Sequence, residues 1–258
     1  AKKKLDAQKD YVQMVDSRPS SAKDVAAFQM NYVEAMSGSR RLNLTSRRIG
    51  DASMEGIADN LANNTMLRFL VLGRNDIGVK GVRLLATALL SNITLTRLDI
   101  GSNQFGNEGV ILLAESLHTN CTLQRLDLYN TPMDESGALA VAKCLKVNKT
   151  LRELSLRGNN MGNEGAMLIG DSLRYNTVLT SLFLQENNVD PIPGMIGFIT
   201  SMYSIDNFVL ERLEGIDLSE FSRILDISPE PTAMSNNKIL AMMRKRRGLH
   251  VSKRVMNN

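Results

Sequence analysis

The hydrophobic positions of this chain recur in one pattern at intervals of 28 residues. Each copy has leucine or isoleucine at three positions, then an asparagine three residues further on, then another apolar residue two positions later. The three apolar positions are filled by Leu67, Leu70, Leu72; Leu95, Leu98, Ile100; Leu123, Leu126, Leu128; Leu151, Leu154, Leu156; and Leu179, Leu182, Leu184. The asparagine position holds Asn75, Asn103, Asn159 and Asn187, with Thr131 in the remaining place.

Each copy combines two kinds of periodicity. The alternation Leu126-Asp-Leu128 predicts a short strand, whereas the spacing of apolar residues over 109–117 predicts a helix. A single strand and helix cannot bury their apolar faces alone, so the copies are expected to stack and share one continuous core. This arrangement places a parallel sheet on the inside of a curve and the helices on the outside.

Two columns of asparagine follow from the same repeat. The column of Asn75 and Asn103 is predicted to satisfy backbone groups in the turn that leaves each strand. A second column stands where the helices end, and it predicts helix caps in the left-handed conformation. Its members are Asn64, Asn92, Asn120, Asn148 and Asn176.

The motif Leu-x-x-Leu-x-Leu-x-x-Asn-x-Ile/Phe, followed by glycine and a helix with Leu-Ala-x-x-Leu, resembles the ribonuclease-inhibitor-type leucine-rich repeat over roughly residues 39–216. The resemblance implies an α/β fold: a right-handed leucine-rich-repeat solenoid, or horseshoe, with the parallel sheet on the concave side and helices on the convex side. The family includes inhibitors, GTPase activators, actin-filament cappers and axonemal subunits, so fold alone does not fix function.

The ends of the pattern predict three regions: an N-terminal extension with a helical cap over 1–38, a solenoid of about six to seven repeats over 39–227, and a basic tail over 228–258. The first repeat keeps Leu42 and Leu44 in phase. Ser39 takes the place of its first leucine, and Arg47 takes the place of its asparagine. Near the other end, we expect the last strand to be formed by Ile205, Phe208 and Leu210, followed by a closing helix over 217–226.

The net charge of +4 is unevenly distributed. Residues 238–258 hold seven basic residues and no acidic one, which leaves 31 − 7 = 24 basic against 27 acidic residues elsewhere. This composition, next to the apolar run 239–243, predicts a polyanion-binding tail whose partner is an acidic protein surface such as tubulin, or RNA. A solvated tail and a nuclear import signal are the alternatives. The binding residues of the tail would be Arg244, Lys245, Arg246, Arg247, Lys253 and Arg254.

Catalytic and metal-binding chemistry has little support in the sequence. The two histidines, His118 and His250, are far apart in the repeat order, and Cys121 and Cys144 are expected to be ordinary buried or surface thiols. We therefore predict no catalytic residue, no cofactor, no metal and no small-molecule substrate. The absence of a long apolar segment predicts no membrane span, and the low cysteine count predicts a cytoplasmic protein.

Side chains between the strand leucines should point onto the concave face, because successive residues of a strand alternate between its two sides. A mixture of arginine and aromatic residues is favoured at the centres of protein interfaces, so we expect a protein partner there. The alternative is that Arg97 and Arg125 pair with Asp99 and Asp127 and remain solvated. The predicted partner-binding residues are Arg41, Phe69, Arg97, Asp99, Arg125, Asp127, Tyr129, Arg157 and Phe183.

These features favour a non-enzymatic interaction scaffold, a subunit of a large cytoskeletal or axonemal assembly. A Ran-type GTPase activator is an alternative, but that reading expects an acidic C-terminal segment, and here the tail is basic. An actin-capping regulator and a nucleoprotein subunit that binds RNA through its tail are further alternatives. The corresponding locations are cytoskeletal or ciliary, with the nucleus as the other option.

Overall fold

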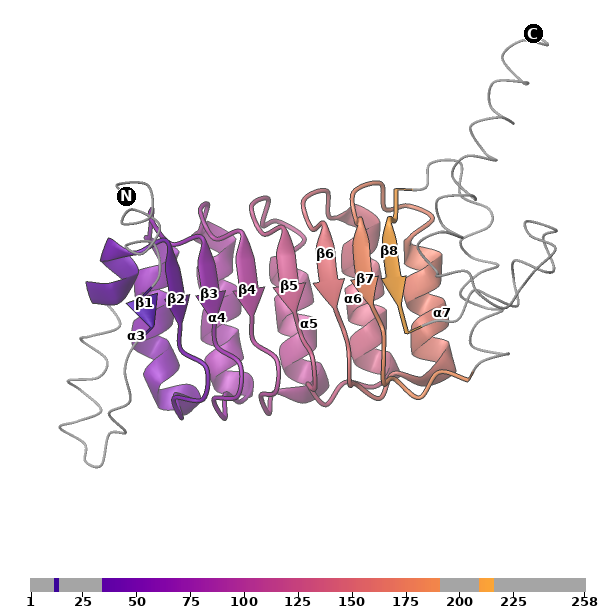
Figure 1. Cartoon of the computed structure of the whole chain (residues 1–258), viewed down its shortest axis with the longest axis horizontal. Coiled ribbons are helices and arrows are strands. Elements are labelled where there is room, and N and C mark those ends of the chain that lie inside the picture. The colour runs from indigo at the N-terminus through magenta and orange to yellow at the C-terminus, as the bar shows by residue number, and fades with distance from the viewer. Residues whose placement is uncertain (1–11, 14–33, 191–208, 216–258) are drawn as a thin grey trace, which may run out of the picture. The chain divides into compact units, whose positions relative to one another are not determined.

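The structure, a computed structural model, describes residues 12–13, 34–190 and 209–215 of the chain (Figure 1). It divides into two compact units, residues 1–133 and residues 134–258. In each unit short parallel strands alternate with α-helices along the chain. We describe the units separately, as unit 1 and unit 2.

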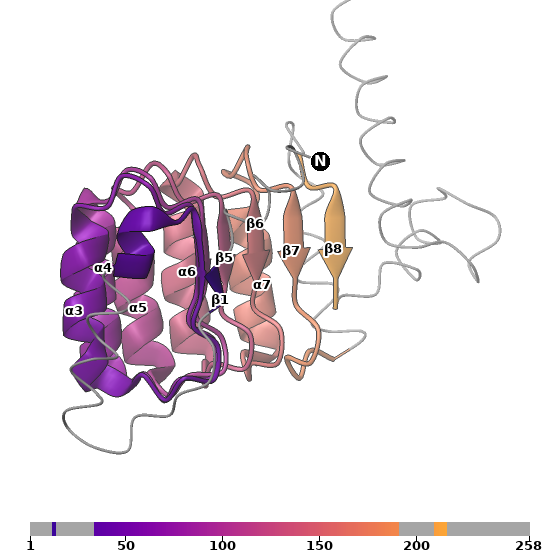
Figure 2. The same ribbon diagram turned by 60° about the vertical axis from the view of Figure 1, so that its left-hand side comes forward.

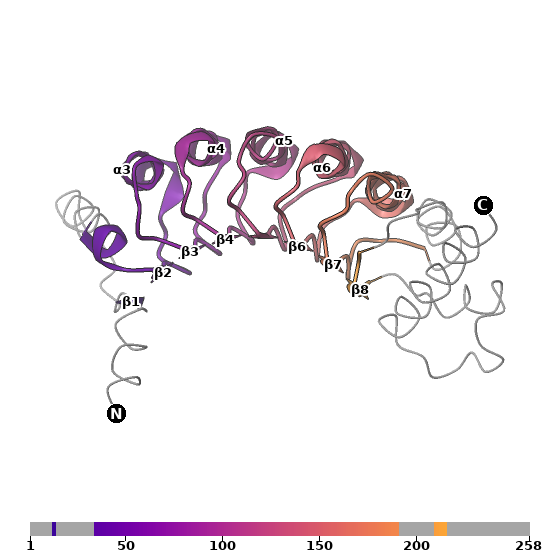
Figure 3. The same cartoon turned by 90° about the horizontal axis from the view of Figure 1, so that it is seen from above.

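Unit 1 consists of one layer of strands covered on one side by one layer of helices (Figures 2 and 3). Neighbouring strands pair in sequence order and in parallel, and α3 packs against α4, which packs against α5. The elements are β1 (Val12–Gln13), β2 (Arg41–Asn43), α3 (Gly50–Ala62), β3 (Phe69–Val71), α4 (Val79–Ser91), β4 (Arg97–Asp99), α5 (Gly106–Ser116) and β5 (Arg125–Asp127).

Unit 2 repeats the same arrangement. Strand β7 pairs in parallel with β6 and with β8, and α6 packs against α7. Its elements are α6 (Glu135–Val147), β6 (Glu153–Ser155), α7 (Gly162–Ser172), β7 (Ser181–Phe183) and β8 (Arg212–Glu214). The predicted alternation of strand and helix is therefore confirmed in both units.

The central leucine of each strand forms the core between the two layers. In unit 1 the strand register aligns Leu42, Leu70, Leu98 and Leu126, and none of them is more than 3% exposed. In unit 2 the register aligns Leu154, Leu182 and Leu213 in the same way. Because a strand side chain is buried on one side only, its two neighbours in the sequence face away from the helices.

The asparagines that follow the strands connect successive repeats. Asn103 Nδ2 donates to the carbonyl oxygen of Ile100 at 2.8 Å and to that of Leu72, in the preceding repeat, at 3.0 Å. Its Oδ1 accepts from the backbone N–H groups of Asn75 and Ile77, both at 3.0 Å. The predicted role of these asparagines in the turn is confirmed. Their side chains also bond the preceding repeat, so the buried asparagines form a ladder of hydrogen bonds from repeat to repeat. Thr131 is fully buried, and its hydroxyl has no hydrogen-bond partner in the part of the chain that the structure describes.

The second asparagine column does not have the predicted left-handed conformation. Asn92 has φ −72° and ψ 123°, and Asn148 has φ −65° and ψ 131°, so both are extended. The side chain bonds the backbone groups that follow the helix, so no left-handed turn is needed there. Asn92 Oδ1 accepts from the N–H of Thr94 at 3.0 Å and of Leu95 at 2.7 Å. Its Nδ2 donates to the carbonyl oxygen of Leu61 in the preceding repeat at 2.6 Å. These asparagines therefore connect the helix ends of adjacent repeats.

At its N-terminal end, unit 1 has a strand that the repeat pattern does not reveal. Val12 and Gln13 form β1, which pairs in parallel with β2. Residues 34–38 are helical, and Met36 and Ser39 are buried. The boundaries 1–38, 39–227 and 228–258 stay predictions.

The predicted last strand is wrong. Strand β8 is centred on Leu213, which aligns with Leu182, so the repeat spans 213 − 182 = 31 residues and is longer than the others. Leu210 is buried and takes the first leucine position of this repeat, which is three residues earlier than the strand centre. The connection before β8 is longer than the others, whereas we expected a shorter one. The predicted strand was therefore placed too early in the sequence. Ile205, Phe208 and the predicted helix over 217–226 lie outside the described residues.

Candidate functional site

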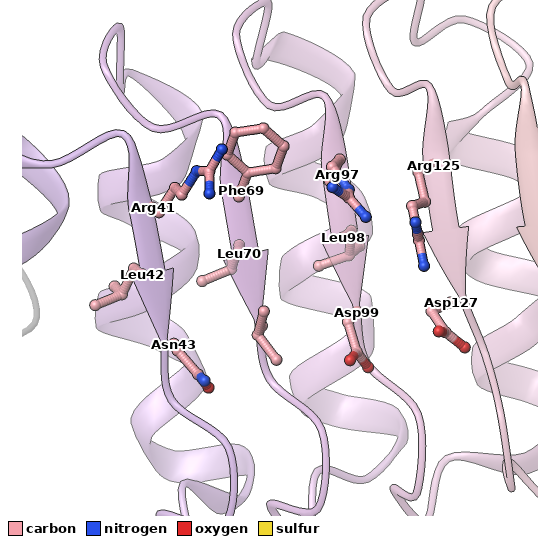
Figure 4. Close-up of a pocket in the computed structure, with 11 residues that line it drawn as sticks. Arg41, Leu42, Asn43, Phe69, Leu70, Arg97, Leu98, Asp99, Arg125 and Asp127 are labelled. Atoms are coloured by element: carbon pink, nitrogen blue, oxygen red, sulfur yellow. The ribbon is translucent and has the colours of Figure 1, made fainter. Parts of the chain in front are cut away.

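The face of unit 1 opposite its helices carries an open pocket of about 240 Å³ (Figure 4). Strands β2 to β5 contribute all of its lining, and we call it the unit 1 groove. Its lining residues are Arg41, Leu42, Asn43, Phe69, Leu70, Val71, Arg97, Leu98, Asp99, Arg125 and Asp127. Six of the nine predicted partner-binding residues are brought together here.

The first residue of each strand gives the groove a row of cations around one aromatic ring. The Cζ atom of Arg41 lies 4.4 Å from the centroid of the Phe69 ring, and that of Arg97 lies 5.3 Å from it. Arg125 aligns with Arg97 on the next strand and extends the row (Figure 4). Cation–π contacts of this kind contribute roughly 0.5–1 kcal/mol at exposed sites and restrict the guanidinium groups that make them.

The third residue of each strand gives the groove an opposite edge. Asp99 and Asp127 align on β4 and β5, so two carboxylates are neighbours. Burial, and then the negative charge of Asp127, raise the pKa of Asp99 from 3.8 to about 6, although the N–H of Gly101 and the charges of Arg125 and Arg74 act against the increase. The charge of Arg125 acts on Asp99, and the predicted pairing of Arg97 and Arg125 with these aspartates stays a prediction.

Tyr129 lies beside the acidic edge and depends on glycine for its place. A Cβ added at Gly101 would lie 2.1 Å from Tyr129 Cδ1, and one added at Gly73 would lie 3.1 Å from the Tyr129 hydroxyl oxygen and 3.3 Å from an Asp99 oxygen. The ring therefore packs against the backbone of the turn that follows β4. Only glycine at position 101 leaves enough room for it. Its backbone N–H donates to Asp127 Oδ1 at 3.2 Å.

The remaining two predicted residues, Arg157 and Phe183, belong to unit 2. Arg157 forms an ion pair with Glu186 at 2.6 Å, and Phe183 lies under the guanidinium of Arg212, whose Cζ is 4.8 Å from the ring centroid. Arg212 in turn pairs with Glu214 at 2.5 Å. Sequence reasoning missed Arg212 and Glu214 because it misplaced the last strand. The triplet Arg-Leu-Glu at 212–214 repeats the Arg-Leu-Asp of 97–99 and 125–127, and this signal was available.

The candidates for metal binding and for nucleophilic chemistry are histidine, cysteine and acidic side chains. The described residues contain no group of three or more of them that could hold a metal ion. Both cysteines are free thiols, and burial raises the pKa of Cys144 to about 12, which disfavours its reactive thiolate form at neutral pH. Among the described residues, every helix is too short or too polar to span a membrane. The basic residues predicted for the tail, from Arg244 to Arg254, lie outside the described residues.

Comparison with known proteins identifies the repeat. A family model described as "Leucine Rich repeat" matches residues 63–86, 91–114 and 147–170. The chain therefore contains leucine-rich repeats. Its strands and helices form the α/β solenoid typical of these repeats, and the 28-residue spacing agrees with the ribonuclease-inhibitor-like class.

Two solved structures of leucine-rich-repeat domains are similar to this protein. One, "Leiomodin-1 Actin-Binding Site 2", is 20% identical, and the match covers 69% of this chain and 97% of that chain with a TM-score of 0.51. The other is a tropomodulin C-terminal domain from Caenorhabditis elegans, 14% identical, with coverage of 59% and 92% and a TM-score of 0.49. No curated protein matches the sequence. At these identities the likeness establishes the fold alone.

Proposed function

We propose that this leucine-rich-repeat protein is a non-enzymatic interaction module that holds a protein partner on the strand face of unit 1. The observation that carries the proposal is the unit 1 groove, an open pocket lined by arginines, a phenylalanine and two aspartates. Arginine and aromatic side chains are enriched at the energetic centres of protein interfaces. A rigid parallel sheet also presents these side chains in a fixed order, which favours one partner over others.

We place the partner in the cytoskeleton, where the sequence also suggested an axonemal assembly. The leiomodin-1 fragment that shares this fold is named as an actin-binding site. Repeats of this class bind many unrelated proteins, so a shared fold does not identify the partner. It makes actin the first partner to test. Tubulin is the second, since its acidic surface would suit a basic tail.

The groove is tested by filling it. Val71 lines the groove, so Val71→Trp should obstruct the partner. Ile93→Trp is the matched control, because Ile93 is 72% exposed and lies outside the groove lining. Each full-length variant is mixed with actin filaments or with microtubules and sedimented, and partners cross-linked in cell extract are identified by mass spectrometry. We expect Val71→Trp to lose partners that the wild type and Ile93→Trp retain. Identical partners for all three proteins would refute the proposal.

The tail is proposed to make a second contact with an acidic protein surface, and its alternative partner is RNA. Neutralising Arg244, Lys245, Arg246 and Arg247 with glutamine in the full chain should weaken microtubule binding and make it less sensitive to salt. If binding to a single-stranded RNA falls steeply with salt in the wild type and is lost in this variant, while microtubule binding is unchanged, the nucleoprotein alternative is correct. That outcome would also favour a nuclear location over a cytoskeletal or ciliary one.

A further inference from the structure

The outer face of helices α6 and α7 in unit 2 carries apolar side chains that the fold does not bury. Leu139 and Met167 lie on the two helices and are 38% and 37% exposed. Val147 ends α6 and Tyr175 follows α7, and they are 52% and 55% exposed. The members of each pair are one 28-residue repeat apart and the helices pack side by side, so the pairs form two rows across the helices (Figure 3). We call this surface the unit 2 helix face.

The repeat does not require apolar residues at these positions. Apart from Ile111, the equivalent positions of unit 1 hold polar residues that are exposed, and these are Glu55, Arg83, Asn63, Ser91 and Thr119. The core of unit 2 therefore has no need of the two apolar rows. Apolar side chains that gather on the exposed surface of a folded domain mark sites of interaction.

The unit 2 helix face is also polarised by charge. Residues 143–149 and 171–175, where the two helices end, hold three lysines and one arginine against one aspartate. At the opposite end of the face, Glu135 and Glu164 lie in the first turns of α6 and α7. A partner that covers the whole face must therefore be acidic where it meets the lysine end and basic where it meets the glutamates.

Tyr175 is held in place at the lysine end. Lys146 Nζ lies 5.2 Å from the centroid of the Tyr175 ring, and Lys149 Nζ donates to the backbone carbonyl oxygen of Tyr175 at 3.3 Å. Lys146 is itself fixed by an ion pair with Asp171 at 2.7 Å. A side chain that is already restricted loses less conformational entropy when a partner covers it. Tyrosine is also enriched among the residues that dominate binding energy, so Tyr175 is suited to anchor a partner.

We propose that the unit 2 helix face binds an amphipathic α-helix of a partner protein, with the acidic N-terminal half of that helix at the lysine end. Leu139 and Val147 are eight residues apart on α6, which is about 12 Å, and apolar residues at i, i+4 and i+7 of a partner helix span a similar length. Helices favour acidic residues in their first turn and basic residues in their last, so an antiparallel partner matches both ends of the face. The basic run of this chain over residues 244–247 has the wrong charge for the lysine end.

The test uses a fluorescent, stapled helical peptide of about 15 residues, with leucines at i, i+4 and i+7 and glutamates in its N-terminal half. Its binding to the full chain is measured by fluorescence anisotropy. Val147→Ser with Tyr175→Ser removes the apolar row at the lysine end. The matched control is Leu90→Ser with Ile93→Ser, because these unit 1 residues are 56% and 72% exposed. We expect the first double variant to weaken peptide binding about tenfold and the control to change it by less than about twofold.

A charge exchange tests the orientation of the partner independently of folding. Lys143→Glu with Lys149→Glu should weaken binding of the glutamate peptide about tenfold and strengthen binding of a twin peptide with lysines in place of the glutamates by a similar factor. A variant that had only lost its fold would not exchange one peptide for the other.

The proposal is overturned if Val147→Ser with Tyr175→Ser binds the glutamate peptide like the wild type, or if the control variant loses the same affinity. It is also overturned if the charge exchange leaves the preferred peptide unchanged. Vesicles that contain phosphatidylserine provide the other test. If they bind through Lys143, Lys149 and Tyr175 while the peptide does not bind, the unit 2 helix face contacts an anionic membrane surface and the partner helix is wrong.

Discussion

The strand faces of the two units use the same residue types in different ways. On unit 2, arginines are balanced by glutamates close by: Arg157 pairs with Glu186, and Arg212 pairs with Glu214. On unit 1, arginines neighbour arginines and aspartates neighbour aspartates. Unit 2 thus places opposite charges together on its face, whereas the register of unit 1 places like charges on adjacent strands.

This difference shows that a repeat fixes the scaffold but leaves the exposed positions free to diverge. The buried leucine of each strand is constrained by the layer of helices, and it is the same in β2 to β8. The residues on either side of it contact solvent and are not constrained in this way. Binding properties of the two faces can therefore differ although their backbones are alike.

The largest expected effect comes from attacking the common scaffold. Leu126 is 3% exposed, so Leu126→Asp would bury a carboxylate without a partner and should destabilise the protein by more than about 4 kcal/mol. Thermal unfolding followed by circular dichroism should show loss of the cooperative transition of unit 1. Gln124→Asp, two residues away at an exposed position, is the control and should melt like the wild type. A normal melting curve for Leu126→Asp would contradict the shared leucine core.

A smaller effect is expected where the unit 1 face depends on close packing. Gly101→Ala forces the Tyr129 ring to move, because the new Cβ would lie 2.1 Å from Tyr129 Cδ1. We expect a loss of about 1–3 kcal/mol in urea unfolding. Gly56→Ala, in helix α3 with no atom within 4 Å of the added Cβ, should instead be neutral or stabilising. Equal effects of the two substitutions would show that Tyr129 does not occupy this place.

The acidic edge should make the stability of unit 1 depend on pH. The folded state raises the pKa of Asp99 from 3.8 to about 6, so it binds the proton more tightly than the unfolded chain does. The Asp99 contribution to stability therefore increases as the pH falls from about 6 towards 3.8 and is lost as the pH rises through 6. Asp99→Asn should remove this dependence.

We expect Asp99→Asn to be more stable than the wild type at pH 7.5, by about 1 kcal/mol after allowance for solvent screening. Urea unfolding at several pH values measures the effect. Asp59→Asn removes the same charge from an exposed position of α3 and should leave the pH profile of the wild type unchanged. If Asp99→Asn and Asp59→Asn give the same profile, Asp99 does not titrate as described.

The smallest effect is expected on the face of unit 2. Arg157 and Glu186 have side chains that are 56% and 60% exposed, and exposed ion pairs contribute little. Arg157→Gln should leave the urea midpoint unchanged within error. A clear decrease of the urea midpoint in this variant would show that the exposed ion pair contributes to stability.

Much of the fold follows from the sequence because two constraints act at fixed spacing. The alternation around Leu126 and Leu128 places the strands, and the asparagine three residues later marks each turn. Both signals come from buried positions, and the residue types at buried positions can be read from the sequence. They locate the unit 1 groove as well, since Arg97 and Asp99 must face away from Leu98.

The remainder depends on interactions that a repeat pattern does not record. Strand β1 has two residues and lies outside the 28-residue spacing, so pairing with β2 is its only signal. The connection before β8 has extra residues, which shifted the expected strand away from Leu213. The contact of Tyr129 with Gly101 requires the turn geometry, and the raised pKa of Asp99 requires its degree of burial.

Thr131 has a consequence for how the molecule loses its structure. Every asparagine of the unit 1 ladder donates to one repeat behind it, and Asn103 also accepts from that repeat, so disruption at one rung removes support from the next. Threonine has no amide, so the ladder of unit 1 has no further rung of this kind after Asn103. Cooperative melting that spreads along these amides should stop there. A calorimetric trace with two separable heat absorptions, merging when the amide is restored by Thr131→Asn, would be the signature of such a boundary.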